Sequence, residues 1–341
     1  MRTEYLTVSP DSPEPDLIDR AAAVLRAGGL VAFPTETVYG LGAAALDPIA
    51  VAGIFRAKGR PSFNPLIVHV LDADMARPLT SAWPETADVL VRTFWPGPLT
   101  LVLPKANGVP DAITAGLPSV ALRAPSHPVA RALIAALGAP IAAPSANRST
   151  AISPTAAAHV AKGLMGRIGM ILDGGTTNVG LESTVLSLAE AVPVLLRPGS
   201  ISREALEAVI GPVRLRTEAP EGETGRPSPG LMTVHYAPRM PTWRFAPGEA
   251  PHQPVPAGTA GLITLGMRLP APEGWRVIRL PETPGGAAAG FYAALHTLED
   301  AGVAAIWVES PPADPAWAGL RDRLDKASRP SPDSDRHGQV V

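Results

Sequence analysis

The sequence predicts an α/β protein of two domains: a larger one with a mixed, twisted sheet and helices, and a smaller parallel one towards the C-terminus. The chain has 341 residues, a length suited to two domains of roughly 100–200 residues each. Strand patterns alternate with helix patterns, but in the larger part some strands follow one another directly, which is typical of a mixed sheet. A polar stretch rich in Gly and Pro, RTEAPEGETGRPSPG, begins at Arg216 and has the composition of a linker.

The larger domain, residues 10–212, is predicted from short apolar runs and amphipathic periodicity. Its first helix, 16–27, carries Leu17, Ala21 and Leu25 on one face, and a pair of glycines ends it. We expect the remaining helices over 48–58 and 128–137, and strands over 30–33, 66–70, 99–103, 119–123, 141–143, 170–172, 184–188 and 194–197.

The smaller domain, residues 243–330, follows a linker over 213–242 and shows a cleaner alternation of strands and helices. This alternation predicts a small parallel sheet of the Rossmann-like kind. The last stretch, RPSPDSDRHGQVV, has a disordered composition, and residues 331–341 are placed outside the domain. Strands are expected over 261–265, 276–280 and 304–308, and helices over 290–301 and 315–328.

The composition excludes several classes of protein and site. Hydrophobic residues make up 46% of the chain, enough for a real core, and the net charge of −2 argues against a strongly basic nucleic-acid binder. No cysteine is present, which excludes disulfides, thiol nucleophiles, iron–sulfur clusters and cysteine-based zinc sites. The first residues lack the layout of a signal peptide, and no apolar run reaches about 18 residues, so we expect a cytoplasmic protein.

The stretch FPTETVYGLG, residues 33–42, carries an unusual number of hydroxyl groups. Thr35, Thr37 and Tyr39 stand with the carboxylate of Glu36 between an apolar run and two glycines. An ordinary turn uses Gly, Pro, Asn or Asp and rarely so many hydroxyls. We therefore expect this segment to bind a polar ligand.

Four cations stand at the ends of predicted helices and strands. Lys58 and Arg60 are separated by one glycine, so both can reach one phosphate chain, although a solvated helix end also favours such charges. Arg123 ends an apolar strand, and a nearly buried guanidinium needs an anion: either an internal salt bridge or a bound carboxylate or phosphate. Arg197 ends another apolar strand in LLRPG.

Other polar groups follow the same pattern. His69 falls on the strand LIVHV, either as an ordinary core histidine or as a ligand contact, and IAAPSAN carries Ser145 and Asn147 after an apolar strand. Ser153 in SPT is typical of the N-cap of a following helix. The segment DGGTTNVGLEST combines paired glycines, which let a backbone approach a ligand closely, with a final Glu-Ser-Thr.

Taken together, these segments predict one ligand site at a single rim of the sheet. Strand ends often converge on one crevice in α/β proteins. The cations indicate an anionic ligand such as a polyphosphate or carboxylate, and the hydroxyls a small polar one. The common phosphate loop, the dinucleotide fingerprint, the HExxH motif and the GxSxG elbow are all missing from the sequence. Phosphoryl or nucleotidyl transfer by positioning and charge stabilisation fits best.

The motifs resemble those of a known family. FPTETVYGLG, KGRPSFNPLIVHV, FWPGPLTLVL, VALRAP, PIAAPSAN, DGG…GLESTV and LLRPGSI stand in the order seen in YrdC-like proteins. The resemblance covers roughly residues 10–212, and HYAP before the small domain is similar to the two-domain form of L-threonylcarbamoyladenylate synthases. It implies a YrdC-like fold and a reaction that joins L-threonine, bicarbonate and ATP into threonylcarbamoyl-AMP, with release of pyrophosphate. The product serves the threonylcarbamoyladenosine modification of tRNA beside the anticodon, completed by a separate transferase complex.

The resemblance also implies roles for individual residues. Lys58 and Arg60 would be catalytic, with Mg²⁺ held mainly by the ATP phosphates. Those implied to bind L-threonine are Thr37, His69, Arg123, Ala143 and Ser183. Those implied to bind ATP are Arg60, Asn64, Ser119, Ser145, Ser153, Arg197 and Thr233.

The segment before HYAP departs from the family pattern. Relatives commonly carry a lysine, a tyrosine and a basic residue there, whereas this chain has Met232, Thr233 and Val234. Because threonine cannot stack on a nucleotide as tyrosine can, we expect weaker closure of the linker over the site.

The sequence has three other interpretations. A double-stranded RNA or tRNA-binding module of the same fold would lack synthase activity, and the net charge disfavours it. A carbamoyl-adenylate domain of the hydrogenase maturation type would carry cysteine motifs that this chain lacks. A nonenzymatic paralogue is disfavoured because the KGR, SAN and arginine positions are all present.

Overall fold

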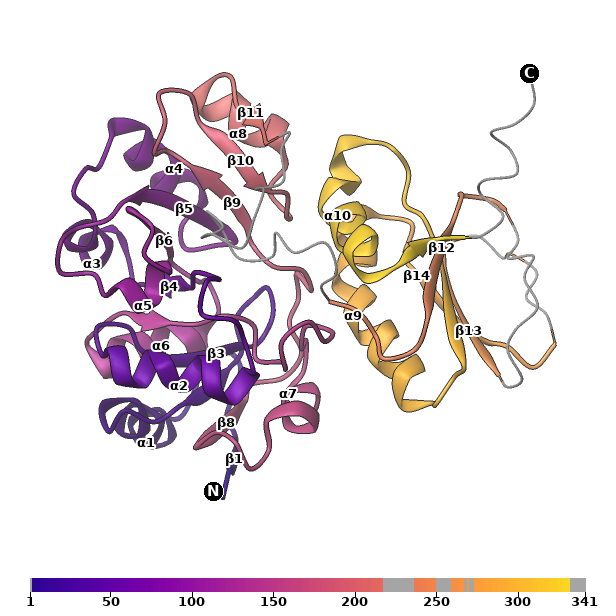
Figure 1. Cartoon of the computed structure of the whole chain (residues 1–341), viewed down its shortest axis with the longest axis horizontal. Helices are drawn as coiled ribbons and strands as arrows, with labels where there is room; N and C mark the ends of the chain where they lie inside the picture. Colours follow the sequence, from indigo (N-terminus) through magenta and orange to yellow (C-terminus); the bar gives the residue numbers. More distant parts are fainter. Residues whose placement is uncertain (1, 217–235, 250–258, 267–268, 270–272, 332–341) are drawn as a thin grey trace. The chain divides into compact units, whose positions relative to one another are not determined.

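The computed structural model describes residues 2–216, 236–249, 259–266, 269 and 273–331. It divides into two units, each with its own sheet (Figure 1). Unit 1 comprises Met1–Ser149 and Ser153–Leu231, and unit 2 comprises Thr150–Ile152 and Met232–Val341. Among the described residues, no helix is both long and apolar enough to cross a membrane.

Unit 1 is built on a mixed sheet of eleven strands, in the order β1-β8-β2-β3-β7-β4-β6-β5-β9-β10-β11. Neighbours β4 and β6, and β5 and β9, run parallel, whereas β3, β7 and β4 pair antiparallel, so the predicted mixed sheet is confirmed. The strands are β1 (Glu4–Thr7), β2 (Val31–Phe33), β3 (Gly40–Ala44), β4 (Ile67–His69), β5 (Leu99–Pro104), β6 (Ser119–Arg123), β7 (Ile141–Ala142), β8 (Met170–Asp173), β9 (Thr184–Ser187), β10 (Val194–Arg197) and β11 (Arg214–Leu215).

The helices of unit 1 bury two separate apolar cores against this sheet. One core joins α1 and α6 to β2 and β8, and the other joins α2, α4, α5, α7 and α8 to the central strands. The helices are α1 (Pro15–Arg26), α2 (Pro48–Lys58), α3 (Ala73–Ala76), η1 (Arg77–Leu79), α4 (Glu85–Phe94), α5 (Asp111–Thr114), α6 (Pro128–Leu137), α7 (Ala157–Leu164) and α8 (Arg203–Ile210).

Local capping explains why α2 and α6 have their predicted limits. The Asp47 carboxylate accepts hydrogen bonds from the backbone N–H groups of Ile49 and Ala50, and Pro48 occupies the first turn. Gly59 ends α2 with a φ of 63°, and Gly138 ends α6 with a φ of 69°. These caps fix where the chain leaves α2, and therefore where Lys58 and Arg60 lie.

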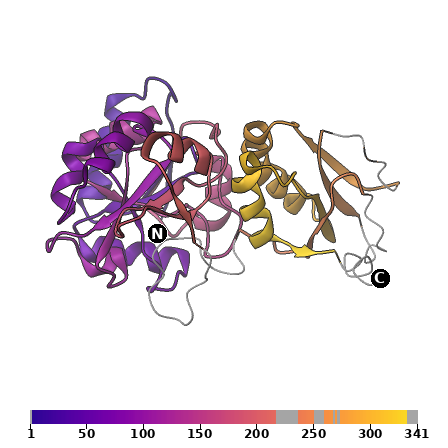
Figure 2. The same ribbon diagram turned by 90° about the horizontal axis from the view of Figure 1, so that it is seen from above.

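Unit 2 has a five-stranded sheet in the order β14-β13-β15-β12-β16. Every pair in it is parallel, which confirms the predicted parallel α/β domain. Helices α9 and α10 cover one face of this sheet, as the two views agree (Figures 1 and 2). The elements are β12 (Thr242–Phe245), β13 (Ala260–Leu265), β14 (Arg276–Leu280), α9 (Pro284–Asp300), β15 (Ala305–Glu309), η2 (Pro315–Trp317), α10 (Ala318–Ala327) and β16 (Arg329–Pro330).

Three local predictions were wrong. Ser153 is not an N-cap, because α7 begins at Ala157 after Ala156, four residues further on. The start of the predicted linker is strand β11, which pairs with β10. The stretch RPSPDSDRHGQVV, predicted to be disordered, begins with strand β16, and the N–H of Ser331, the first residue of the predicted tail, donates to the carbonyl of Arg244. Most of the predicted linker (217–235) and of the predicted tail (332–341) lie outside the described residues.

Candidate functional site

One transverse row of residues crosses five central strands on one face of the sheet of unit 1. His69 on β4 is the register partner of Arg123 on β6, and Thr100 on β5 and Arg197 on β10 are both partners of Val185 on β9. The β5–β6 register, in which Leu101 pairs with Leu122, places Thr100 opposite Arg123. Cross-strand partners share a face of a sheet. We call His69, Arg123, Thr100 and Arg197 the polar row.

An apolar patch lies beside the polar row on the same five strands. It is a cluster separate from the two cores under the helices, and its members are buried. We call it the apolar floor; it consists of Ile67, Val102, Ala121, Val185, Val194 and Leu196. The sheet thus offers a polar strip and an apolar strip next to each other.

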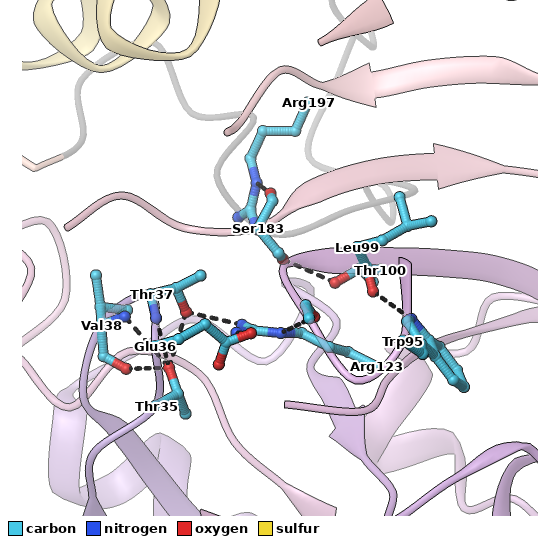
Figure 3. Close-up of polar contacts among 11 residues, drawn as sticks. Thr35, Glu36, Thr37, Val38, Trp95, Leu99, Thr100, Arg123, Ser183 and Arg197 are labelled. Carbon is cyan, nitrogen blue, oxygen red and sulfur yellow. Dashed lines mark hydrogen bonds and ion pairs between the residues drawn. The ribbon is translucent and has the colours of Figure 1, made fainter. Parts of the chain in front are cut away.

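Arg123 joins the polar row to the segment 34–39 and to the turn before β5 (Figure 3). Its Nη2 lies 2.8 Å from the Glu36 carboxylate, and its Nη1 donates to the Thr37 hydroxyl at 2.8 Å. Its Nε donates to the carbonyl of Gly97 at 3.3 Å. The Thr35 hydroxyl donates to the carbonyl of Val38, so Thr37 must donate its proton to Thr35, 2.8 Å away. Of the two alternatives left open by the sequence, the structure contains the internal salt bridge.

Glu36 and Arg123 meet at ion-pair distance but not in hydrogen-bonding geometry. Both side chains are about 95% buried. Yet neither carboxylate oxygen of Glu36 nor the Nη2 of Arg123 makes a hydrogen bond within the described part of the chain. Buried polar atoms normally find such partners, because leaving one unsatisfied costs about 1–3 kcal/mol.

His69 is held as a neutral imidazole. Burial lowers the pKa of His69 to about 3, with a further contribution from the positive charge of Arg123. The ring packs edge-on against Phe33, with centroids 6.3 Å apart. Its Nδ1 is buried and has no hydrogen-bond partner among the described residues.

Ser183 links the polar row to strand β9 (Figure 3). Arg197 donates from Nη2 to the Ser183 hydroxyl at 3.2 Å and from Nε to the Ser183 carbonyl at 3.1 Å. The same hydroxyl lies 2.7 Å from that of Thr100. Gly199 allows this close approach, because a Cβ there would lie 2.4 Å from the backbone nitrogen of Thr184.

Lys58, at the end of α2, binds the PSAN segment. Its ammonium donates to the carbonyl oxygens of Ser145 and Asn147, and to the Asn147 side-chain oxygen at 3.2 Å. Burial, with Arg60 and Arg148 nearby, lowers the pKa of Lys58 well below its usual range. Lys58 therefore holds the loop that carries Ser145, instead of extending into solvent.

The remaining predicted site residues surround this segment. Arg60 donates to the carbonyl of Pro65 at 3.2 Å. Ala143 is buried and its N–H donates to the carbonyl of Ile67. The Ser153 hydroxyl donates to Glu182 at 2.5 Å. Asn64 is buried in the loop after α2, and Ser119 begins β6. Thr233 lies outside the described residues.

The prediction of a single rim was wrong in its geometry. Since β7 runs antiparallel to β4, the PSAN segment leaves the sheet beside Ile67, at the opposite end of β4 from His69. Ser119 is likewise four residues, or about 13 Å, from Arg123 along β6. The predicted residues therefore form two groups at opposite ends of the same strands, with the segment 34–39 reaching from one group to the other.

Sequence reasoning assigned no role to Glu36 or Thr100. Thr100 could have been found, because it is a polar residue inside the apolar strand LTLVLP. Glu36 stands in the motif FPTETVYGLG, but only the ion pair in the structure identifies Arg123 as its partner. In the described part of the chain no cluster of three or more His, Asp or Glu residues could hold a metal ion.

Two family models match the chain, one after the other along the sequence. Residues 23–199 match the Sua5/YciO/YrdC model, described as telomere recombination. The chain belongs to this family. Residues 201–329 match the model described as the C-terminal domain of threonylcarbamoyl-AMP synthase. Both models together support the two-domain form of the family.

Individual relatives agree with the family assignment. The chain is 55% identical over 225 residues to the threonylcarbamoyl-AMP synthase of Bacillus subtilis (strain 168), covering 66% of this chain and 65% of the relative. It is 53% identical over 220 residues to that of Pyrococcus abyssi (strain GE5 / Orsay), covering 64% of each. These alignments span slightly less than two thirds of the relatives' length.

A solved structure matches over nearly the whole chain. The structure of P. abyssi Sua5 complexed with L-threonine has a TM-score of 0.87 and 40% sequence identity, and the match covers 96% of this chain and 98% of that one. The predicted fold class, a YrdC-like mixed sheet followed by a small parallel α/β domain, is therefore confirmed.

The low pKa of His69 makes folding stability depend on pH. Between pH 7 and pH 5 an unfolded His69, with its ordinary pKa of 6.5, takes up a proton, whereas the folded one does not. The free energy of unfolding should therefore fall as the pH falls through this window. In His69→Asn that fall should be smaller by about 1–2 kcal/mol, measured by denaturant unfolding at both pH values. Equal falls in both proteins would contradict the neutral buried histidine.

Gly199 should not tolerate a side chain. In Gly199→Ala the new methyl group meets the backbone at Thr184, and overpacking of this kind costs about 1–3 kcal/mol. Gly108→Ala is the matched control, because a Cβ there meets nothing within 4 Å, and it should change stability by less than about 0.5 kcal/mol. Equal unfolding free energies for the two variants would refute the close approach.

Proposed function

We propose that this protein is an L-threonylcarbamoyladenylate synthase, a nucleotidyltransferase that makes threonylcarbamoyl-AMP and pyrophosphate from L-threonine, bicarbonate and ATP. The observation that carries the proposal is the face of the sheet with two separated polar groups and the apolar floor between strand ends. Such a surface suits a ligand with a charged amino acid at one end and a nucleotide at the other. The family membership and the relatives named threonylcarbamoyl-AMP synthase support the same activity.

The polar row is the proposed threonine end. Arg123 would bind the substrate carboxylate, and Thr37 and Ser183 would offer hydroxyls. Neutral His69, whose Nδ1 accepts no hydrogen bond within the described chain, would accept one from the threonine side-chain hydroxyl. The backbone of Ala143, which lies beside Ile67 at the other end of β4, is also proposed to contact threonine.

The opposite group is the proposed nucleotide end. Arg60, Asn64, Ser119, Ser145 and Ser153, which lie outside the polar row, are proposed to contact ATP. Arg197, from the polar row, and Thr233, which lies outside the described residues, are proposed to contact ATP as well. Lys58 would act through the PSAN segment, since its donors already bind that segment. Mg²⁺ would enter with ATP, bound by its phosphates.

The reaction would proceed by positioning and charge stabilisation. The threonine ammonium gives one proton to bicarbonate, which loses water and becomes carbon dioxide. The neutral amine nitrogen then bonds to the carbon of carbon dioxide and releases its second proton to solvent, which gives a carbamate. A carbamate oxygen then attacks the α-phosphorus of ATP, and pyrophosphate leaves from the opposite side. Arg60 and Arg197 would offset the negative charge that develops on the leaving group. The product would then supply threonylcarbamoyladenosine formation on tRNA.

The activity can be tested directly with the full chain. Incubation with MgATP, bicarbonate and L-threonine should release pyrophosphate and yield threonylcarbamoyl-AMP, detected by mass spectrometry. L-Serine should be a poorer substrate, because it lacks the methyl group. If the reaction released no more pyrophosphate than a control reaction without threonine, the proposed function would be refuted.

Replacing Arg123 and replacing Arg60 should weaken the binding of different substrates. Arg123→Ala should raise the KM for threonine by about 10- to 100-fold, and Arg60→Ala should do so for ATP, because each loses a charge-assisted contact. Arg20→Ala is the matched control, since its guanidinium pairs with Glu4 at the exposed surface. If both site variants raised the same KM, the assignment of two ends would be wrong.

A further inference from the structure

The buried pair of Glu36 and Arg123 carries unused hydrogen-bonding capacity of both signs. Glu36 has two carboxylate oxygens without a donor, and Arg123 has one nitrogen, Nη2, without an acceptor, within the described chain. Both side chains of the pair are buried, so water does not freely supply the missing hydrogen-bond partners. An unused pair of acceptors next to an unused donor suits a ligand that carries both a cationic and an anionic group.

The pair also has a fixed geometry. Thr37 and the carbonyl of Gly97 bind the other two nitrogens of the guanidinium, so Arg123 cannot turn to satisfy its third. Glu36 is fixed by its backbone, because its carbonyl accepts a hydrogen bond from the N–H of Val179. The positive and negative groups therefore stay next to each other, 2.8 Å apart.

A free α-amino acid matches this pattern of charge. Its ammonium and carboxylate are attached to the same carbon, so one molecule can reach Glu36 and Arg123 at once. The two charges of the site cancel, as do those of the zwitterion, so binding leaves no net buried charge. A 2-hydroxy acid of the same shape would satisfy Arg123 but would leave Glu36 without a donor.

We infer that Glu36 binds the α-ammonium group of the amino-acid substrate. This inference rests on the proposed function and adds the residue that distinguishes an amino acid from other small carboxylic acids. Glu36 thereby holds the nitrogen on which the carbamate is built, next to the carboxylate held by Arg123.

A purely structural role for Glu36 predicts a different result. If Glu36 only held Arg123 in place, its loss would weaken every ligand that uses a carboxylate, with or without an amine. If Glu36 contacts the ammonium, its loss weakens the amine-bearing ligand selectively. The ratio of two affinities therefore separates the two roles, whereas either affinity alone does not.

The test is calorimetric titration of the full chain, without ATP or bicarbonate, using L-threonine and the 2,3-dihydroxybutanoate of the same configuration. The unmodified protein should bind threonine at least about 10-fold more tightly than the hydroxy acid. In Glu36→Gln threonine affinity should fall by about 10- to 100-fold and the ratio should approach one. Glu85→Gln, an exposed acid in the first turn of α4, is the control and should keep the original ratio.

Each outcome decides one point. A ratio unchanged in Glu36→Gln overturns the inference and leaves the synthase intact. A protein that binds neither ligand overturns the proposed function, and the inference with it. If Glu36→Gln does not fold, Glu36→Asp replaces it, because it keeps the charge but withdraws the carboxylate by one methylene group. The ratio should then fall part of the way, and an unchanged ratio contradicts the inference.

Discussion

The buried guanidinium of Arg123 is the constraint on which the site depends. It lies at the end of β6 and contacts the segment 34–39 and the turn before β5, and Arg123 is the register partner of His69 on β4. An uncompensated charge at this depth would cost several kcal/mol, so the surrounding polar groups must approach it. Thr37, Glu36 and the Gly97 carbonyl surround the guanidinium and compensate its charge. The same charge also helps to keep His69 neutral.

Lys58 and Arg123, two of the buried cations of unit 1, differ in how fully their hydrogen bonds are satisfied. At Lys58 the buried cation is bound by three oxygens, which makes it part of the scaffold of the PSAN segment. At Arg123 the ion pair is equally buried but retains unsatisfied atoms on both partners. A cation with all its hydrogen bonds met has little to offer a ligand, whereas one with an open donor does. The exposed fractions of Lys58 and Arg123 are similar, so exposure alone does not distinguish their roles.

The sequence predicted elements where the chemistry is local. Asp47, Gly59 and Gly138 set the limits of α2 and α6, and a reader of the sequence can see all three. Strand β3 was missed because GLGAA has little intrinsic strand preference. It forms because Gly42 packs so closely on Phe33 and Ile141 that a Cβ would lie 2.8 Å from each. The contact between Gly42 and Ile141 joins residues about 100 positions apart, and no local pattern encodes it.

The site shows the same limit. Residue types at strand ends identified most of the candidates, but their grouping depends on register, which alternation along one strand does not give. The two groups are nevertheless coupled by a single dipeptide. Glu182 accepts the Ser153 hydrogen bond near the PSAN segment, while Ser183 binds Arg197 and Thr100 in the polar row. Successive side chains of an extended chain point to opposite sides, so one short segment contacts both groups. Gly199 packs against this segment without space for a methyl group, so the close packing of the site continues from Ser183 into Thr184.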